Sequence, residues 1–374
     1  MERRRFIRTA GLGALAAGGA LAGCGSREPA SSPGAVAPST EVRHWKMVTT
    51  WPKNFPGLGT GAEFFARLIA EMSGGRLQVK VYGAGELVPP FEVFDAVTRG
   101  AAEMGHGSAY YWKGKNEAFQ FFSSVPFGFT ADEMNAWLYH GGGMALWREA
   151  YAPFGVVPMA VGNTGVQMGG WLNKEIHSLD DLKGLKMRIP GLGGEVLKRA
   201  GGLPVNLPGG ELFTSLQTGA IDATEWVGPY NDLAFGLYKA AKYYYYPGWH
   251  EPGTTLECIV SREAMESLPA DLQSIVHNAA RVANQDMLTE YVARNNDALR
   301  TLVDEHHVQL RRFPDDVLTE LRRLSAAVVR EVADRSEFGT KVYQSYQAFR
   351  DKVIAWEDVS ERAYLNARGA GTPP

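Results

Sequence analysis

Apolar positions in the first part of the chain switch between strand-like and helix-like spacing. Residues 42–50 predict a strand, and the alternating apolar residues of 77–81 predict a second one. Between them, Thr60 and Glu63 fit a capping box that opens a helix. The expected apolar face of this helix consists of Phe64, Phe65, Leu68, Ile69 and Met72. Gly74-Gly75 is expected to end the helix.

The same alternation of strands and helices continues along the chain. Pro89-Pro90 opens the next predicted helix, whose apolar residues are Phe91, Phe94 and Val97. Further on, residues 178–181 fit a capped helical turn, and residues 185–189 predict a strand. A helix over 195–199 and a strand over 204–207 follow. Strands that alternate with helices are typical of parallel βαβ units, so the predicted fold class is α/β.

Two distant segments share one pattern. AVTRGAAEMGHG (96–107) and SLQTGAIDATEW (215–226) each combine a helix end, a glycine, small residues, an acid and a short strand. The corresponding residues are Gly100 with Gly219 and Glu103 with Asp222. Chance similarity is the alternative to a duplicated design. We expect two α/β lobes, one over 42–162 with part of 250–310 returning to it, and one over 163–249.

The pattern changes at Pro269, after which helical spacing dominates. The stripe of the first long helix consists of Leu272, Val276, Ala279 or Ala280, and Ala283. Further helices are expected over about 315–335 and 341–363. Helices that follow two α/β lobes suggest, for residues 270–366, a role in bracing the lobes or in dimerisation.

The N-terminal segment has the pattern of an export signal. Residues 1–23 combine a basic start, a short Gly/Ala/Leu run and small residues, and the run is too short for a lasting membrane span. RRRFI (3–7) resembles a twin-arginine signal, with a general secretory signal as the alternative. Leu-Ala-Gly-Cys resembles a lipobox and predicts lipidation of Cys24. Residues 24–41 are rich in Ser, Pro and Ala and predict a flexible tether.

Composition narrows the possible functions. The chain has 374 residues, 45% of them hydrophobic, which is enough for two packed domains. Removal of residues 1–23 takes away four arginines and one glutamate, so the formal net charge falls from -3 to -6. An acidic exported chain is a poor candidate for nucleic-acid binding. With Cys24 lipidated, Cys258 has no partner for a disulfide, and its apolar surroundings predict a buried core residue.

The common enzyme signatures are missing. The loop at 191–196 lacks the third glycine of a dinucleotide fingerprint, and no P-loop ending follows. We interpret it as a tight turn between strand and helix. His250-Glu251 is not part of an H-E-x-x-H motif, and neither G-x-S-x-G nor C-x-x-C is present. His306-His307 fits a solvated surface pair, and residues 243–246 a half-buried strand. The chain is therefore not expected to be an enzyme.

Four sites at predicted strand ends carry candidate chemistry. Gln167, Arg188, Glu225-Trp226 and Glu251 each lie next to Gly or Pro after a strand, where open α/β sheets bind ligands. Arginine binds a carboxylate through two parallel charge-assisted bonds. A nearby glutamate would repel that anion unless it neutralises the arginine or holds a cation, and hard cations prefer oxygen ligands. The alternatives are a plain Arg188–Glu225 salt bridge and a turn capped by Gln167.

The same residues carry a family resemblance. TTWPKNFPGLGTGAE, DLKGLKMRIPGLGGEVL, FTSLQTGAIDATEWVGPYND and YYYYPGWHEPG resemble segments of the substrate-binding proteins of tripartite ATP-independent periplasmic (TRAP) transporters. The similarity runs from about Trp45 to the C-terminal helices and is greatest to the branch that binds 2-oxo and 2-hydroxy monocarboxylates such as pyruvate or lactate. It implies a type II-like periplasmic binding fold, with two lobes around a cleft and long helices spanning both. A sensory module and an exported enzyme are the competing functions.

The resemblance also implies roles for single residues. Arg188 is expected to bind the ligand carboxylate, beside a sodium or calcium ion held by Gln167, Glu225 and Trp226. Gln167 and Trp226 are expected to contact the substrate as well, and Glu251 to contact the metal or the ligand. Weaker candidates for the cleft wall are Tyr111, Asn163 and Phe55. The family works with a membrane permease of a small and a large subunit, and this branch tends to dimerise through swapped C-terminal helices. The mature protein is thus expected in the periplasm, anchored through Cys24.

Overall fold

The first β-sheet is built mainly from the N-terminal part of the chain. The computed structural model describes residues 41–369, so the predicted signal, Cys24 and the tether up to Thr40 lie outside the described residues. The sheet has the strand order β2-β1-β3-β10-β4. Its strands are β1 (Arg43–Thr49), β2 (Leu77–Tyr82), β3 (Met104–Gly107), β4 (Val156–Asn163) and β10 (Thr255–Ser261). β2, β1 and β3 run parallel, whereas β10 is antiparallel to both of its neighbours.

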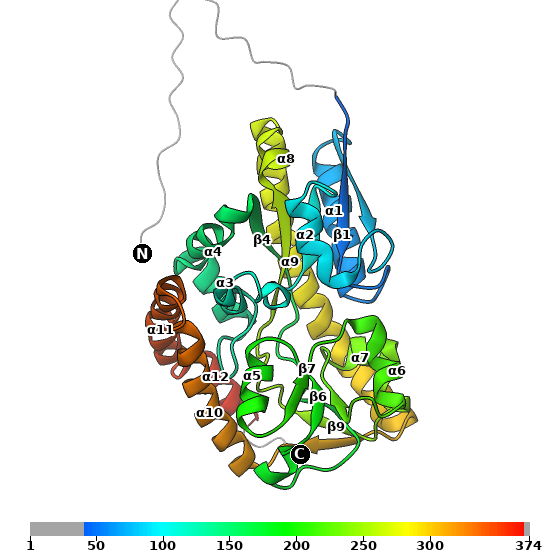
Figure 1. The fold of residues 1–374 in the computed structure, drawn as a ribbon, viewed down its shortest axis with the longest axis vertical. Helices are drawn as coiled ribbons and strands as arrows, with labels where there is room; N and C mark the ends of the chain where they lie inside the picture. The colour runs from blue at the N-terminus through cyan, green and yellow to red at the C-terminus, as the bar shows by residue number, and fades with distance from the viewer. Residues whose placement is uncertain (1–40, 370–374) are drawn as a thin grey trace, which may run out of the picture. The chain divides into compact units, whose positions relative to one another are not determined.

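The second sheet repeats this topology. Its order is β11-β9-β5-β8-β6-β7. The strands are β5 (Gly170–Leu172), β6 (Lys186–Arg188), β7 (Leu203–Val205), β8 (Ala223–Thr224), β9 (Tyr243–Tyr246) and β11 (Gln309–Arg312). β7, β6 and β8 are parallel, and β5 is antiparallel to β8 and β9. Two βαβαβ units therefore have the same strand order and direction, which confirms the two-sheet α/β fold (Figure 1).

Helices connect the strands of each unit in the same way. The helices that follow the predicted alternation are α1 (Leu58–Met72), α2 (Val93–Thr98), α5 (Gly191–Arg199) and α6 (Leu212–Gln217). α3 (Ala131–His140), α4 (Gly143–Tyr151), α7 (Pro229–Phe235) and α8 (Arg262–Glu266) lie in the longer connections. The short 3-10 segments include η2 (Ala109–Trp112), η3 (Glu117–Phe122) and η5 (Leu179–Leu182). The capping box predicted at Ser178 and Asp181 is present.

Long helices bridge the two sheets. α9 (Ala270–Arg300) packs against α1 and β4 on one side and against α7 on the other. All residues of its predicted apolar stripe are buried. α10 (Asp315–Ala333) packs on α5, and α11 (Glu337–Glu357) packs on α4 and η3 (Figure 1). α12 (Glu361–Gly369) follows and has no buried residue. The brace therefore contacts helices from both α/β units.

Four local predictions need correction. Residues 309–312 form strand β11, so the C-terminal region is not helical throughout. Helix α1 begins at Leu58 behind Gly57, so Thr60 and Glu63 lie inside the helix and form no capping box. Met72 is exposed. Helix α5 begins at Gly191, so the glycines after β6 form its first turn rather than a separate loop. In the last case, a Cβ on Gly194 would lie only 2.6 Å from the Ile189 carbonyl oxygen, which explains the glycine.

Three smaller predictions are confirmed. Cys258 is fully buried in β10, where burial raises the pKa of its thiol. His306 and His307 are exposed. The tyrosine run forms β9, with Tyr244 and Tyr245 buried. No helix within residues 41–369 is long and apolar enough to cross a membrane.

Candidate functional site

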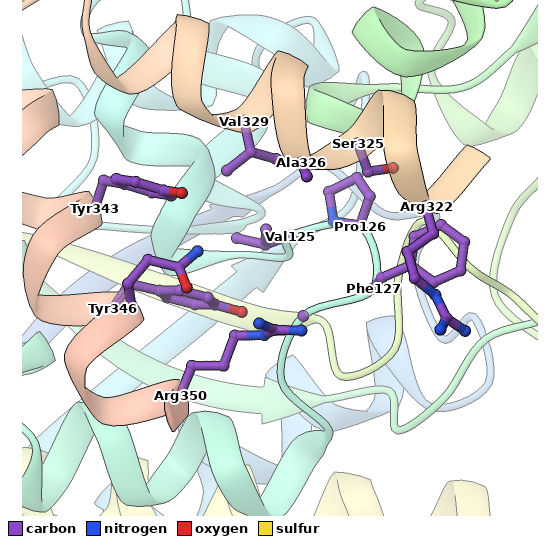
Figure 2. A pocket seen from close by; sticks show the side chains of 12 residues that line it. Val125, Pro126, Phe127, Arg322, Ser325, Ala326, Val329, Tyr343, Tyr346 and Arg350 are labelled. Atoms are coloured by element: carbon purple, nitrogen blue, oxygen red, sulfur yellow. The ribbon is translucent and has the colours of Figure 1, made fainter. Parts of the chain in front are cut away.

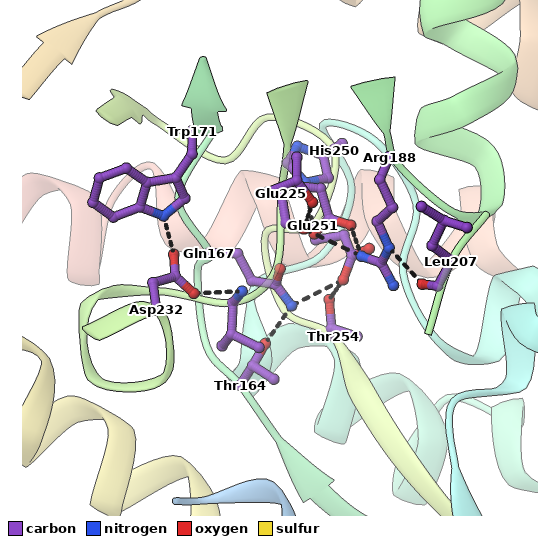
Figure 3. Close-up of polar contacts among 12 residues, drawn as sticks. Thr164, Gln167, Trp171, Arg188, Leu207, Glu225, Asp232, His250, Glu251 and Thr254 are labelled. Carbon is purple, nitrogen blue, oxygen red and sulfur yellow. Dashed lines mark hydrogen bonds and ion pairs between the residues drawn. The ribbon is translucent and has the colours of Figure 1, made fainter. Parts of the chain in front are cut away.

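An ion pair at the ends of β6 and β8 forms the centre of the candidate site. Arg188 is the last residue of β6 and is 1% exposed. Its guanidinium is paired with the carboxylate of Glu225, which follows β8 directly (Figure 3). Arg188 Nε also donates to the Leu207 carbonyl (3.1 Å), and Nη2 donates to the Tyr111 hydroxyl (3.2 Å). β6 and β8 are parallel neighbours, so their carboxyl ends bring the two side chains together.

The charges of this centre are nearly balanced. Burial disfavours the charged guanidinium, but the Glu225 carboxylate keeps the pKa of Arg188 above its ordinary value. Burial, and after it the charge of Glu225, raises the pKa of the neighbouring Glu251 to about 8. Arg188 and Glu225 therefore neutralise each other. An anion that bound here alone would add a buried net charge, whereas an anion and a cation together would not.

Gln167 and Glu251 form the other half of the site. Gln167 Nε2 donates to Glu251 Oε2 (2.9 Å) and to Thr164 Oγ1 (3.1 Å). The Thr254 hydroxyl donates to the same Glu251 oxygen (2.6 Å; Figure 3). The backbone joins the two segments as well, because the Gln167 N–H donates to the Glu251 carbonyl (3.1 Å). These bonds fix the amide of Gln167 with its carbonyl oxygen free of any hydrogen bond.

Several buried polar atoms gather here without a hydrogen-bond partner. Within residues 41–369 these atoms include Gln167 Oε1, Glu225 Oε2, Trp226 Nε1 and both ring nitrogens of His250. Each buried unpaired group costs roughly 1–3 kcal/mol, and native proteins keep few of them. One ligand atom from each of Glu225, His250 and Glu251 lies within 4.8 Å of the others. The acceptor oxygens of this group, Gln167 Oε1 and Glu225 Oε2, fit a hard cation such as sodium or calcium.

The predicted wall residues fall into two groups. Tyr111 contacts Arg188 directly, as described above. The Trp226 ring lies under the Arg188 guanidinium (5.1 Å from its centroid), and Phe55 meets the same ring edge-on (6.4 Å between centroids). Asn163 differs, because its side chain donates to the Gly253 carbonyl (3.2 Å) and accepts from the Gly165 N–H (2.9 Å). The amide of Asn163 therefore joins the backbone after β4, at Gly165, to the backbone before β10, at Gly253.

Sequence reasoning missed His250. Its ring is fully buried, and Nε2 lies 3.5 Å from Glu225 Oε2. A Cβ on Gly193 would come within 2.9 Å of the His250 Cβ, so the glycine of α5 makes room for this histidine. The available signal is its position beside Glu251 in PGWHEPG, although the two residues form no H-E-x-x-H motif. Thr164 and Thr254, which hold Gln167 and Glu251, were also missed.

One cavity adjoins the candidate site, and another lies apart from it. One of about 430 Å³ adjoins it and is bounded by Tyr110, Tyr111 and Ile189, with the Lys113–Glu195 ion pair (3.0 Å) among its other lining residues. It lies between η2 of the first unit and α5 of the second. The other, of about 90 Å³, lies between residues 125–128, α10 and α11 (Figure 2). It shares no residue with the candidate site.

Comparison with known proteins identifies the family. Residues 47–363 match the DctP family, described as bacterial extracellular solute-binding protein family 7. This match covers most of the chain, and the chain belongs to that family. The predicted resemblance to TRAP solute-binding proteins is thereby confirmed, as is the fold class. The members of the family are transport proteins that bind solutes.

Individual relatives cover nearly the whole chain. A monocarboxylate 2-oxoacid-binding periplasmic protein of Nostoc sp. is 44% identical over 366 residues, which is 98% of each chain. A TRAP periplasmic solute-binding protein from Pseudoalteromonas atlantica, solved with bound sodium and pyruvate, is 43% identical with a TM-score of 0.85. That similarity covers 87% of this chain and 99% of the other. A protein from Colwellia psychrerythraea, solved with bound calcium and pyruvate, is 42% identical with a TM-score of 0.85, over 87% and 100% of the chains.

Proposed function

We propose that this protein captures a small monocarboxylate, a 2-oxo or 2-hydroxy acid such as pyruvate or lactate, together with a metal cation, and delivers it to a TRAP membrane permease. The observation that carries the proposal is the buried Arg188–Glu225 pair beside acceptor oxygens that have no hydrogen bond. Relatives that bind 2-oxoacids, two of them with pyruvate and a cation in their structures, support the ligand class.

One half of the site binds the ligand carboxylate, and the other half binds the cation. Arg188 binds the ligand carboxylate, because a planar guanidinium matches the geometry of a carboxylate and, within residues 41–369, Glu225 is its one ion-pair partner. Gln167 Oε1, Glu225 Oε2 and the Trp226 carbonyl hold the cation, and Glu251 contacts the cation or the ligand. Bound there, the cation supplies positive charge beside the carboxylate. Tyr111, Phe55 and the Trp226 ring enclose the ligand, and Gln167 also contacts it. Asn163 supports the wall from behind.

The two units close around the ligand as lobes. We assign residues 42–162, with part of 250–310, to the first lobe and 163–249 to the second, with 270–366 as the brace. The Lys113–Glu195 ion pair supports the closure, because it joins the end of η2 in the first unit to α5 in the second beside the site. The site residues come from both, since Tyr111 follows β3 whereas Arg188 ends β6.

The proposal includes a location and partners. Export through residues 1–23 and lipidation of Cys24 place the protein in the periplasm on a membrane, beside the small and large permease subunits. A homodimer through the C-terminal helices is supported by exposed apolar side chains on and before α12. These side chains are Trp356, Val359, Tyr364 and Leu365.

Calorimetry with a carboxylate panel tests the proposal. Purified protein is titrated with pyruvate, lactate, longer 2-oxo acids and a dicarboxylate, each in sodium, in calcium and after removal of both. We expect tight binding of a monocarboxylate that weakens by at least about tenfold without either cation, because the anion would then add an unbalanced buried charge. Absence of binding across the panel would reject the proposed function. Cation-independent binding would reject the metal site alone.

A further inference from the structure

A buried carboxylate lies behind the loop that carries the proposed cation ligands. This loop, residues 225–228, connects β8 to α7 and contains Glu225 and Trp226. Asp232, in the first turns of α7, is 1% exposed and directs its side chain back to this loop. Its Oδ1 accepts the Val227 backbone N–H (3.3 Å). A side chain of the following helix thus holds the loop from inside the protein.

The same carboxylate is fixed to the sheet on its other side. Asp232 Oδ2 accepts from the Trp171 indole N–H (3.0 Å; Figure 3) and from the Tyr244 hydroxyl (2.7 Å). Trp171 belongs to β5 and Tyr244 to β9, and their buried rings stack with centroids 4.0 Å apart. One side chain therefore connects the loop, helix α7 and two strands. Its position cannot change without moving one of them.

The loop is tied to Gln167 through the next backbone bond. The Val227 carbonyl accepts the N–H of Met168, the residue after Gln167 (2.9 Å). The backbone N–H of Val227 is consequently bonded to Asp232, and its backbone C=O is bonded to the segment of Gln167. Glu225, Trp226 and Gln167 supply the proposed cation ligands. Their relative positions depend on where Val227 is held.

We propose that Asp232 is a positioning residue for the cation half of the site, which fixes Glu225 and Trp226 relative to Gln167 through Val227. This inference rests on the proposed function. Asp232 touches neither ligand nor cation and acts through the backbone of the loop. Burial raises the pKa of Asp232 to about 7, and its three hydrogen-bond donors lower it in part. An acid kept here without a counter-ion serves as an acceptor for donors on two sides, which a neutral side chain of the same shape does not provide.

The substitution Asp232→Asn distinguishes the hydrogen bond to the loop from the hydrogen bonds to the sheet. An amide has one oxygen and one NH₂ group, so it accepts on only one side. The side with two donors, Trp171 and Tyr244, binds the oxygen, and the NH₂ group then faces the Val227 N–H. The substitution thereby keeps the core bonds and releases the loop.

The control is Glu257→Gln in the first unit. Glu257 is a buried acid whose Oε1 accepts from the Trp112 indole (2.5 Å) and the Tyr151 hydroxyl (3.1 Å). Neither of its oxygens bonds the backbone of the site, and Oε2 has no hydrogen bond. Glutamine keeps the Oε1 bonds. The control therefore changes a buried acid of the same kind without touching the 225–228 loop.

Two measurements on the full-length exported protein test the inference. In Asp232→Asn, hydrogen exchange of residues 225–228 is expected to rise by about tenfold or more, the effect of one lost hydrogen bond on local opening. In the same variant, the factor by which calcium raises the affinity for pyruvate is expected to fall by about tenfold. In Glu257→Gln, the exchange of residues 225–228 and the calcium factor are both expected to stay within about twofold of the wild type. Equal behaviour of the two variants in either measurement would overturn the positioning role. If the wild type binds no pyruvate, the proposed function fails, and the exchange measurement alone still decides whether Asp232 anchors the loop.

Discussion

The parallel strand pair β1/β3 of the first sheet (the first edge) and the parallel pair β6/β8 of the second sheet (the second edge) have the same backbone arrangement. Their side chains differ in chemistry. In the first, Met47 pairs with Met104, and in the second Met187 pairs with Ala223. The residue before each pair is held alike: the Lys46 N–H donates to the Glu103 carboxylate (2.7 Å), and the Lys186 N–H to that of Asp222 (2.9 Å). Gly100 and Gly219, which precede these acids, have φ of 74° and 73°. The similarity predicted from the two sequence segments is therefore present in the backbone geometry.

The next positions along these strands differ. Where the second edge has Arg188, the first has Val48, and where the second has Glu225, the first has His106. His106 Nδ1 accepts from the Trp51 indole (2.7 Å), so Nε2 carries the proton and donates to the Val161 carbonyl (3.2 Å). Burial lowers the pKa of His106 to about 4, so it stays neutral. Both ring nitrogens of His106 are thus hydrogen-bonded, whereas Glu225 Oε2 at the equivalent position has no hydrogen bond. The same fold unit carries the candidate site in one place and a buried, hydrogen-bonded histidine in the other.

The largest expected contrast lies between Arg188→Ala and Val48→Ala. Loss of the guanidinium is expected to weaken pyruvate binding by about 100-fold or more, because removal of one partner of a buried charge pair leaves the other uncompensated. Val48→Ala removes a buried side chain at the equivalent position and is expected to cost about 2 kcal/mol of unfolding free energy with little change in affinity. Calorimetry and urea unfolding measure the two quantities.

Arg188→Lys makes this contrast sharper. Lysine keeps the charge but not the planar fork, so we expect a loss of about tenfold or more in affinity. Affinity equal to the wild type in all three variants would mean that the two edges do not differ in function.

A pH experiment addresses the second difference, His106 against Glu225. The folded-state pKa of His106 is about 4, below the ordinary histidine value of 6.5. The unfolded chain then binds more protons between these values, so the stability from His106 is complete above pH 6.5 and is lost as pH falls toward 4. His106→Gln keeps one acceptor and one donor and cannot titrate. Between pH 7 and pH 4 the wild type is expected to lose on the order of 3 kcal/mol relative to this variant.

Thermal or urea unfolding of both proteins over this pH range measures the effect. The comparison with the variant cancels the opposite trend of Asp232 and Glu257, whose pKa values burial raises to about 7. Parallel pH profiles for the two proteins would contradict a buried neutral His106.

The smallest expected effects test the shared backbone. Glu103→Ala and Asp222→Ala each remove the acceptor for one strand N–H, at Lys46 and Lys186 respectively. We expect each to cost about 1 kcal/mol in urea unfolding, the net value of one hydrogen bond, with unchanged ligand affinity. A cost at one edge that is several times the cost at the other would show that the two acids are not equivalent.

Local patterns predicted the elements of the fold well. The apolar stripe of α9, the alternation in β2 and the capped turn at residues 178–181 depend on neighbours in sequence, and all three are present. The start of α1 depends on more than its own sequence. A Cβ on Gly57, the residue before the helix, would lie 2.5 Å from the Tyr291 hydroxyl of α9. A capping-box motif carries no information about that distant contact. The helix start predicted from the motif was therefore wrong.

For the candidate site, sequence placed Arg188, Glu225, Gln167 and Glu251 at strand ends, and the structure brings them together. For Arg188 and Glu225 that step was possible because they lie at the carboxyl ends of the parallel neighbours β6 and β8, whereas Gln167 and Glu251 lie in the β4–β5 and β9–β10 connections between the two sheets. His250 and Asp232 follow no such rule. Asp232 takes its hydrogen bonds from the loop after β8 and from β5 and β9, and no spacing in the sequence announces this combination.

The sequence by itself determined the family, the two α/β units and the residues with charge-bearing chemistry, because these depend on residue type and local periodicity. Only the tertiary structure decided which polar atoms are satisfied. Gln167 Oε1 and Glu225 Oε2 have no hydrogen bond, whereas both ring nitrogens of His106 have one. The reason is that burial and hydrogen bonding depend on segments that meet only in the folded chain. The difference between the two equivalent units, of which one carries the candidate site, therefore arises at the level of packing.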